Sequence, residues 1–199
     1  MTNVSSGHGR SHGSLSGQIG GAPVTPAVIA DLIAANTVDV PDFPQPGVNF
    51  KDLTPLFANG PAFAQVIDAM ATEHGGAFDV VAGVEARGFV LAAAVAYASG
   101  SGLVPIRKAG KLPRKTVSAA YALEYGEAVL EVHADSFEPG ARVLILDDVL
   151  ATGGTAGAAI SLVERAGGVV VGFSVLLELA FLSGRARLGG HDVHALLTV

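Results

Sequence analysis

Two adjacent aspartates stand at the end of an apolar run in the sequence VLILDDVLATGGT, residues 143–155. Asp147 and Asp148 follow four aliphatic residues, and a run of small residues leads from them into an expected helix from about Thr155. In an open parallel sheet, ligands bind beyond the carboxyl ends of the strands. The junction after this expected strand is therefore a candidate binding site.

The small residues behind the acid pair suit a phosphate group. Closely spaced backbone N–H groups, two hydroxyls and the positive end of a helix dipole are supplied by Ala151, Thr152, Gly153, Gly154 and Thr155. The aspartates repel a phosphate and need donors, such as sugar hydroxyls or a divalent cation. A phosphorylated sugar satisfies both halves of the stretch. A plain Asp-Asp turn before a glycine-opened helix is the alternative without a ligand.

Other phosphate-binding motifs fail on inspection. The one Gly-Lys pair, Gly110-Lys111, is followed by leucine and not by the Ser or Thr that a P-loop requires. A G-x-G-x-x-G fingerprint does not follow any expected strand either.

Composition narrows the class of protein. The 199 residues suit one domain, 50% of them are hydrophobic, and the net charge of −6 argues against a general nucleic-acid binder. Cysteine is absent, which excludes disulfides, Cys-ligated zinc and cysteine nucleophiles. We expect residues 1–24, rich in Gly, Ser and His, to form a disordered tail before a single domain at 25–199. Because the tail lacks the apolar core of a secretory signal, we expect a cytoplasmic protein.

One uncharged stretch, Gly88 to Ile106, approaches the length of a membrane span at 19 residues. Its strongly apolar part is short, and Ser99 to Gly102 and Pro105 interrupt any helix. A buried helix, a turn and a strand fit better, so we expect no membrane insertion.

Alternating elements must position the candidate site. Thr25-Pro26 is a typical helix start, and a second helix is expected after Pro61. Apolar strands then alternate with helices from about Gly88 and Thr155, with the strands expected at 78–82, 103–107, 142–147 and 169–177. The pattern predicts an α/β fold with an open, mainly parallel sheet flanked by helices. A hairpin is expected from 119–125 and 127–133, after the polar segment 108–118.

The 143–155 stretch resembles the signature of the type I phosphoribosyltransferases, whose ligand is 5-phosphoribosyl 1-pyrophosphate (PRPP). The resemblance implies that Asp147 and Asp148 hold the ribose 2- and 3-hydroxyls, while residues 151–155 enclose the 5-phosphate. It also implies a small hood and a mobile hairpin or loop beside the sheet. Further segments resemble the adenine-specific members of that family: DFPQPGVNFKDLTPL (42–56), GVEARGF (83–89), RKAGKLPRKT (107–116), YALEYG (121–126), and LEL with SGRARL (177–188).

Phe50 is the candidate base platform. Pro44, Pro46 and Gly47 stiffen and turn the chain before it, and planar bases stack on aromatic faces. The resemblance implies an adenine between Phe50 and Leu179, with its edge read by the backbone near Asn49 and Lys51. Asn49 replaces a usual aliphatic residue. The change is neutral if only the backbone reads the base, and it alters base preference if the side chain intrudes.

Glu124 is the candidate proton carrier. Leu123 and Tyr125 flank it, and desolvation among such neighbours favours the protonated carboxyl. The resemblance places this glutamate against N7 of adenine.

A local basic cluster is what an acidic protein needs for an anionic ligand. Five of the twelve basic residues fall within nine positions: Arg107, Lys108, Lys111, Arg114 and Lys115. Arg87, at a strand-to-helix junction, is implied to bind pyrophosphate. With Gly110 and Pro113 between the cations, we expect a mobile loop that closes over PRPP and brings Lys108 and Lys111 to the leaving group.

The resemblance implies one reaction in purine salvage, in which adenine and PRPP give AMP and pyrophosphate. Mg²⁺ is implied as the cofactor, carried by PRPP without direct protein ligands, and the partner implied is a second copy of the chain. Three alternatives stay open: a sister transferase for hypoxanthine, guanine, xanthine or orotate, a PRPP-sensing regulator without catalysis, and a structural domain with an accidental loop. A regulator of that kind needs a nucleic-acid surface, and the sequence shows neither a helix-turn-helix pattern nor a basic face.

Overall fold

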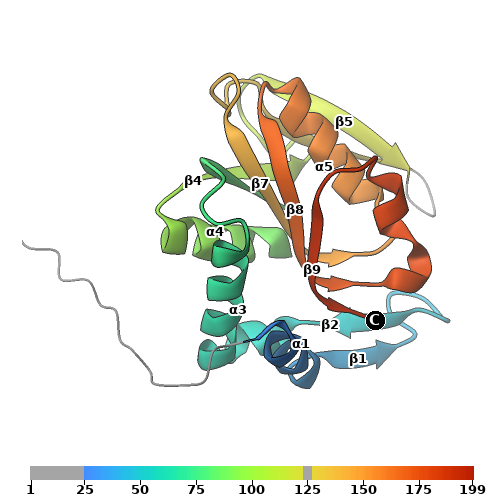
Figure 1. Cartoon of the computed structure of the whole chain (residues 1–199). Coiled ribbons are helices and arrows are strands. Elements are labelled where there is room, and N and C mark those ends of the chain that lie inside the picture. Colours follow the sequence, from blue (N-terminus) through green and yellow to red (C-terminus); the bar gives the residue numbers. More distant parts are fainter. Residues whose placement is uncertain (1–24, 123–126) are drawn as a thin grey trace, which may run out of the picture.

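A seven-stranded sheet forms the centre of the computed structural model, which describes residues 25–122 and 127–199 (Figure 1). The strand order is β5-β6-β4-β3-β7-β8-β9, with bounds β3 Val80–Val84, β4 Gly102–Lys108, β5 Thr116–Ala122, β6 Glu127–His133, β7 Arg142–Leu150, β8 Val169–Glu178 and β9 Val193–Thr198. All pairings from β4 to β9 through β3 are parallel, and β5 and β6 are antiparallel. The predicted open, mainly parallel sheet is confirmed.

Helices cover both faces of this sheet. Their bounds are α1 Pro26–Ala35, α2 Thr54–Ala58, α3 Gly60–Glu73, α4 Arg87–Ser99 and α5 Gly154–Arg165, with short 3-10 turns η1 Ala180–Leu182 and η2 Gly184–Arg187. The predicted start of α1 is confirmed, because the Thr25 side chain accepts a hydrogen bond from the Val28 N–H at 3.4 Å. Asn59 caps α3 in the same way, through the Ala62 N–H at 3.3 Å.

Two apolar layers hold the sheet between the helices. Figure 1 shows α5 beside β5 on one side of the sheet, with α3 and α4 on the other. Side chains of β7 alternate between the layers, so that Val143 and Ile145 join the α5 layer while Leu144 and Leu146 join the α4 layer. All four are fully buried. Because burying such a side chain stabilises the fold by about 1.5–3 kcal/mol, the strand that ends in the acid pair is anchored on both faces.

The uncharged stretch from Gly88 to Ile106 forms a helix, a turn and a strand, as predicted. Helix α4 ends at Gly100, whose φ of 70° reverses the chain into β4. Among the described residues, none of the helices has the length and apolarity needed to cross a membrane.

Three strands, β1 (Val38–Pro41), β2 (Asn49–Asp52) and β9, were not predicted from the sequence. The expected turn before Phe50 closes a separate antiparallel ladder of β1 with β2. The expected hairpin pairs as β5 with β6, although β5 begins earlier, at Thr116, because the ladder continues to a Thr116–His133 pair. The predicted tail at 1–24 and the hairpin residues 123–126, with Glu124, lie outside the described residues.

Candidate active site

The loop after β7 forms a small hollow at the carboxyl edge of the sheet. A cavity of about 60 Å³ is lined by residues 147 and 149–156 together with Phe173. The loop leaves β7 at Leu150, and Gly153 turns it into α5 with a φ of 82°, a conformation that glycine adopts without strain. The N–H groups at the start of α5 have no side-chain cap. The structure thus brings the predicted phosphate loop together around one concave surface that presents helix N–H donors.

The acid pair lies at the edge of this hollow and is largely out of water. Asp147 is 9% exposed and Asp148 is 6% exposed. The Asp148 backbone N–H donates to Asp147 Oδ1 at 2.9 Å. Burial, followed by the nearby charge of Asp148, raises the pKa of Asp147 well above its usual value. Two such carboxylates favour any ligand that donates hydrogen bonds to them, and vicinal hydroxyls are ligands of that kind.

Arg87, the first residue of α4, links the acid pair to the predicted base platform. Its Nε lies 2.5 Å from Asp148 Oδ2, and its guanidinium lies over the Phe50 ring, 5.2 Å from the ring centroid. Gly88 lets the start of α4 lie against the end of β7, because a Cβ there would lie 2.6 Å from the carbonyl oxygen of Leu146. Arg87 therefore has one charged and one aromatic neighbour from different parts of the chain.

The predicted base platform, Phe50 on β2, packs against Phe43 in the turn between β1 and β2. The rings of Phe43 and Phe50 pack edge to face with centroids 5.2 Å apart. A cavity of about 370 Å³ opens beside them, lined by Val40, Phe43, Phe50, Asp52 and Arg87. Sequence reasoning did not single out Phe43 or Asp52. Strand alternation was the available signal for Asp52, which lies two residues from Phe50 and on the same face.

Asn49 and Lys51 point to the opposite face of that ladder. Their side chains meet Asp39, with Asn49 Nδ2 at 3.4 Å and Lys51 Nζ at 2.6 Å from its carboxylate oxygens. The hydrogen bond from Lys51, followed by that from Asn49, lowers the pKa of Asp39. The Asn49 side chain does not line the cavity beside Phe50, and its effect on base preference stays a prediction.

Leu179 lies just after β8 and is half-buried against the apolar layer that contains α4. Its backbone N–H donates to the Leu150 carbonyl oxygen at 2.9 Å, which ties it to the start of the phosphate loop. Its place opposite Phe50 stays a prediction, and so does the role of Glu124.

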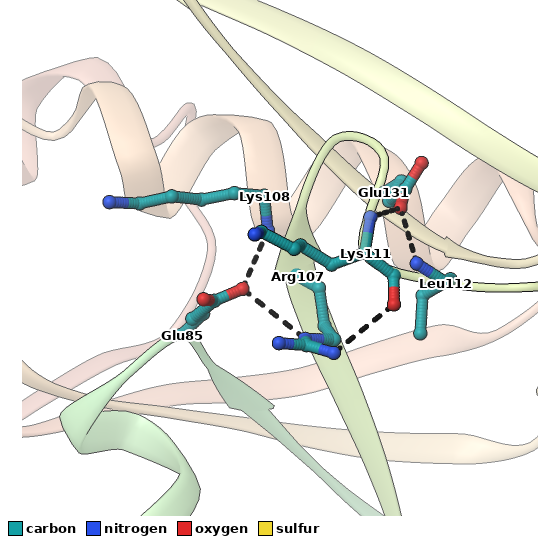
Figure 2. A network of polar contacts seen from close by, with 6 residues as sticks. All are labelled: Glu85, Arg107, Lys108, Lys111, Leu112 and Glu131. Carbon is teal, nitrogen blue, oxygen red and sulfur yellow. Dashed lines mark hydrogen bonds and ion pairs between the residues drawn. The ribbon is translucent and has the colours of Figure 1, made fainter.

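Two glutamates bind the first half of the predicted basic loop, as Figure 2 shows. Glu85 Oε2 accepts from the Lys108 N–H at 2.9 Å and from Arg107 Nε at 3.3 Å. Glu131 Oε1 accepts from the N–H groups of Lys111 and Leu112, each at 2.9 Å. The side chains of Lys108 and Lys111 are exposed. Sequence reasoning missed both glutamates, because their partners lie about twenty positions away in the chain.

These hydrogen bonds also set the charge of the two acids. The Lys108 N–H, with a smaller effect of Arg107, lowers the pKa of Glu85. Burial of Glu131 works to raise its pKa, but the loop N–H groups outweigh burial and lower it overall. Two ionised carboxylates therefore hold the cationic segment through the backbone N–H groups of Lys108, Lys111 and Leu112. The ammonium groups of the two lysines are not used in these hydrogen bonds.

Comparison with known proteins agrees with this geometry. A family model described as Phosphoribosyl transferase domain matches residues 56–192. The adenine phosphoribosyltransferase of Salinispora tropica is 67% identical over 171 residues, covering 85% of this chain and 91% of that protein. Its counterpart from Clavibacter michiganensis subsp. michiganensis is 59% identical over 177 residues, covering 89% of this chain and 99% of that protein.

Solved structures give the same result. The adenine phosphoribosyltransferase of Rhodothermus marinus superposes with a TM-score of 0.82 at 46% identity, covering 87% of this chain and 99% of that one. The enzyme of Saccharomyces cerevisiae, solved with an imino-altritol bisphosphate and adenine, gives a TM-score of 0.82 at 37% identity over 85% of this chain and 99% of that one. With the acid pair and its glycine-bearing loop at the edge of the same sheet, this chain belongs to the phosphoribosyltransferase family, among its adenine phosphoribosyltransferases.

Proposed function

We propose that the chain transfers the phosphoribosyl group of PRPP to adenine, giving AMP and pyrophosphate in purine salvage. The observation that carries the proposal is the position of Arg87, which touches Asp148 on the sugar side and lies over Phe50 on the base side. A sugar-phosphate hollow and an aromatic platform thereby meet at one residue. The identity to adenine phosphoribosyltransferases over most of the chain supports adenine as the base.

The hollow after β7 binds the sugar phosphate, and the cavity beside Phe50 binds the base. The backbone N–H groups of 151–155 bind the 5-phosphate, and Asp147 and Asp148 accept hydrogen bonds from the ribose hydroxyls. Adenine stacks on Phe50, while the backbone of Asn49 and Lys51 reads its edge and Leu179 covers its other face. This arrangement fixes N9 of the base and C1 of the sugar as neighbours, which removes much of the entropic barrier.

In the reaction, adenine N9 forms a bond to C1 while the bond from C1 to the pyrophosphate oxygen breaks. The electron pair of the broken bond leaves with pyrophosphate. Arg87 and the loop cations Lys108 and Lys111 stabilise the developing negative charge, and the carboxylates of 147 and 148 stabilise positive charge at C1. Glu124 has a raised affinity for a proton between its apolar and aromatic sequence neighbours, and in its ionised form it takes up the proton that the base loses.

Mg²⁺ fits this site as an ion carried by PRPP. No cluster of three His, Cys, Asp or Glu side chains able to hold a metal occurs in residues 25–122 and 127–199. The phosphate and ribose oxygens of the substrate are the hard donors that Mg²⁺ prefers, and they would hold the ion without direct protein ligands. When bound, the ion offsets the charge of the departing pyrophosphate.

A parallel assay tests the proposal directly. The purified protein receives Mg²⁺ and PRPP with adenine, hypoxanthine, guanine or orotate, and nucleotide and pyrophosphate are both measured. We expect AMP from adenine and at least a hundredfold lower rates with the other bases. Faster turnover of another base supports a sister transferase, and PRPP binding without any product supports a regulator.

Glu124 has its own test. Glu124→Ala is expected to lower turnover far more than it raises the KM for PRPP, because the side chain acts on the base and not on the sugar. Unchanged turnover would remove Glu124 from the mechanism.

The homodimer and the cytoplasmic location are also part of the proposal. The outer face of α4 leaves Val90 44% exposed and Tyr97 92% exposed, an apolar surface that a second copy of the chain would cover. Light scattering is expected to give twice the 20.0 kDa chain mass. Tyr97→Glu should shift that mass toward the monomer, whereas Val28→Glu on α1 should not. A monomeric wild type contradicts this assignment.

A further inference from the structure

The turn that follows β8 packs directly against the back of the phosphate loop. A Cβ on Gly184 would lie 2.1 Å from the Ala151 carbonyl oxygen and 2.9 Å from the Gly153 nitrogen. A Cβ on Gly153 would in turn lie 2.4 Å from the Gly184 carbonyl oxygen. The loop and the turn are therefore in contact backbone to backbone, with no side chain between them.

Arg185, the residue after Gly184, clamps this turn to the sheet. Its Nε lies 3.0 Å and its Nη2 lies 2.5 Å from the two Glu178 carboxylate oxygens, and its Nη1 donates to the Val193 carbonyl oxygen. A forked guanidinium–carboxylate pair of this kind fixes orientation as well as distance. Arg185 thus ties the turn to the end of β8 and the start of β9.

Glu178 lies beside the residue from which the loop starts. It is 6% exposed, and in the β7–β8 ladder it pairs with Leu150, the last residue before the loop. The next residue, Leu179, donates its N–H to the Leu150 carbonyl oxygen. Glu178 therefore contacts the end of β7 through its backbone and the turn behind the loop through its carboxylate and Arg185.

The loop needs such an external support. Helix α5 begins at Gly154 with no side-chain cap, so no Ser, Thr, Asp or Asn side chain fixes its first N–H groups. A glycine-bearing loop without that bond relies on its surroundings to keep the donors in one arrangement.

We propose that Arg185, held by Glu178, is a positioning residue for the 5-phosphate: it presses the backbone of Gly184 against Ala151 and Gly153 and so keeps the loop N–H donors aligned. The inference rests on the proposed phosphate role of residues 151–155. It predicts a selective defect in PRPP binding, because the clamp touches the loop and not the base platform.

A matched ion pair provides the control. Arg142 and Asp79 also form a forked pair, with Nη2 2.6 Å from Oδ1, but they join the opposite, amino end of β7. Arg142→Gln should lower the thermal midpoint without changing the KM for PRPP. Arg185→Gln should raise the KM for PRPP at least tenfold, with the KM for adenine changed less than twofold, and Arg185→Lys should restore part of the loss.

Folding failure is covered by a second variant. Glu178→Gln combined with Arg185→Gln leaves no unpaired buried charge and keeps neutral hydrogen-bonding groups, so it is expected to fold while showing the same selective rise in the KM for PRPP. Equal rises for PRPP and adenine, or a PRPP KM no different from that of Arg142→Gln, would overturn the inference.

Hydrogen exchange separates failure of the clamp from failure of the site. Ribose 5-phosphate is added to the wild type and exchange at residues 150–155 is followed. Absence of protection overturns the phosphate site and the clamp together. Protection in the wild type with unaltered affinity in Arg185→Gln overturns the clamp alone. Protection in the wild type that is lost in Arg185→Gln but kept in Arg142→Gln supports it.

Discussion

At the scale of single residues, the buried carboxyl of Asp147 lowers the stability of the folded protein. Its burial, together with the charge of Asp148, raises its pKa. A carboxyl whose pKa is higher in the folded than in the unfolded protein destabilises the fold as pH rises from its ordinary value through the raised one. At neutral pH this side chain therefore lowers the stability of the fold, which favours a role in binding over a role in stability.

Asp147→Asn should consequently stabilise the protein and weaken substrate binding. The amide keeps the oxygen that accepts from the Asp148 N–H but removes the charge. We expect the thermal midpoint at pH 7 to rise by about 2–4 °C, the shift that roughly 1 kcal/mol gives in a domain of this size. The loss of a charged acceptor, worth about 1.5–3 kcal/mol, should lower kcat/KM for PRPP about 10- to 100-fold. Asp31→Asn on the exposed face of α1 is the control, and a lower midpoint for Asp147→Asn contradicts the prediction.

Phe50 carries a second prediction at this scale. Stacking a base on an aromatic ring contributes about 1–3 kcal/mol, so Phe50→Leu should raise the KM for adenine about tenfold and leave the KM for PRPP nearly unchanged. The control is Phe63→Leu, since Phe57 and Phe63 form a similar edge-to-face pair with centroids 5.7 Å apart in the α-helical layer. Steady-state kinetics check both. Equal effects of the two substitutions would mean that Phe50 serves packing alone.

Sequence reasoning identified residues that function as one contiguous stretch. Asp147 to Thr155 follow one another in the chain, and their chemistry is local to a strand end and a helix start. Residues that act through distant partners were missed. Glu178 was noticed only within a motif, because nothing in its neighbourhood shows that Arg185 will fold back on it. Glu85 meets its partners only when β3 and β4 pair, and Glu131 only when β4 and β6 pair.

At the scale of elements, β7 is fixed at both ends. The carboxylate of Asp79, just before β3, accepts hydrogen bonds from the Arg142 side chain and from the Arg142 backbone N–H at the start of β7, the latter at 3.0 Å. These hydrogen bonds from Arg142 lower the pKa of Asp79 to about 2. The strand that delivers the acid pair is thus held at its amino end by this forked pair, while at its carboxyl end Leu150 pairs with Glu178 of β8, which holds the other forked pair with Arg185.

A pH dependence follows from the sign of that shift. Because the folded pKa of Asp79 is about 2 and its usual value is 3.8, the stabilisation by this pair is complete above pH 4 and is lost as pH falls toward 2. Asp79→Asn should therefore lower the thermal midpoint at pH 6, and the difference from the wild type should shrink between pH 4 and pH 2. Asp68→Asn on α3 serves as the control. A difference that is constant across this range contradicts the assignment.

The elements themselves were predictable to different degrees. Strands buried on both faces, such as β7 and β8, are continuous apolar runs and were expected from the sequence. The β1–β2 ladder was not expected as strands, because each is four residues long and β1 contains an aspartate and a proline. Its strands form because the Pro and Gly turn between them brings them into register, and tertiary pairing outweighs their weak individual propensity.

At the scale of the whole molecule, the two parts of the candidate site come from segments far apart in the sequence. The base platform precedes residue 53, the phosphate loop lies at 151–155, and Arg87 at the start of α4 touches the residues beside both. The parallel sheet makes this possible, since β3 and β7 are neighbours and both deliver their carboxyl ends to the same edge. The fold therefore brings the predicted base platform and the predicted phosphate loop to Arg87.

The most direct test of this account is the pattern of hydrogen-exchange protection produced by AMP. If the platform and the loop form one site, AMP protects the amides of 49–52 and 150–155 together, adenine alone protects only the first group, and ribose 5-phosphate alone protects only the second. Protection of just one group by AMP, or of neither, would contradict the assignment of both hollows to a single nucleotide.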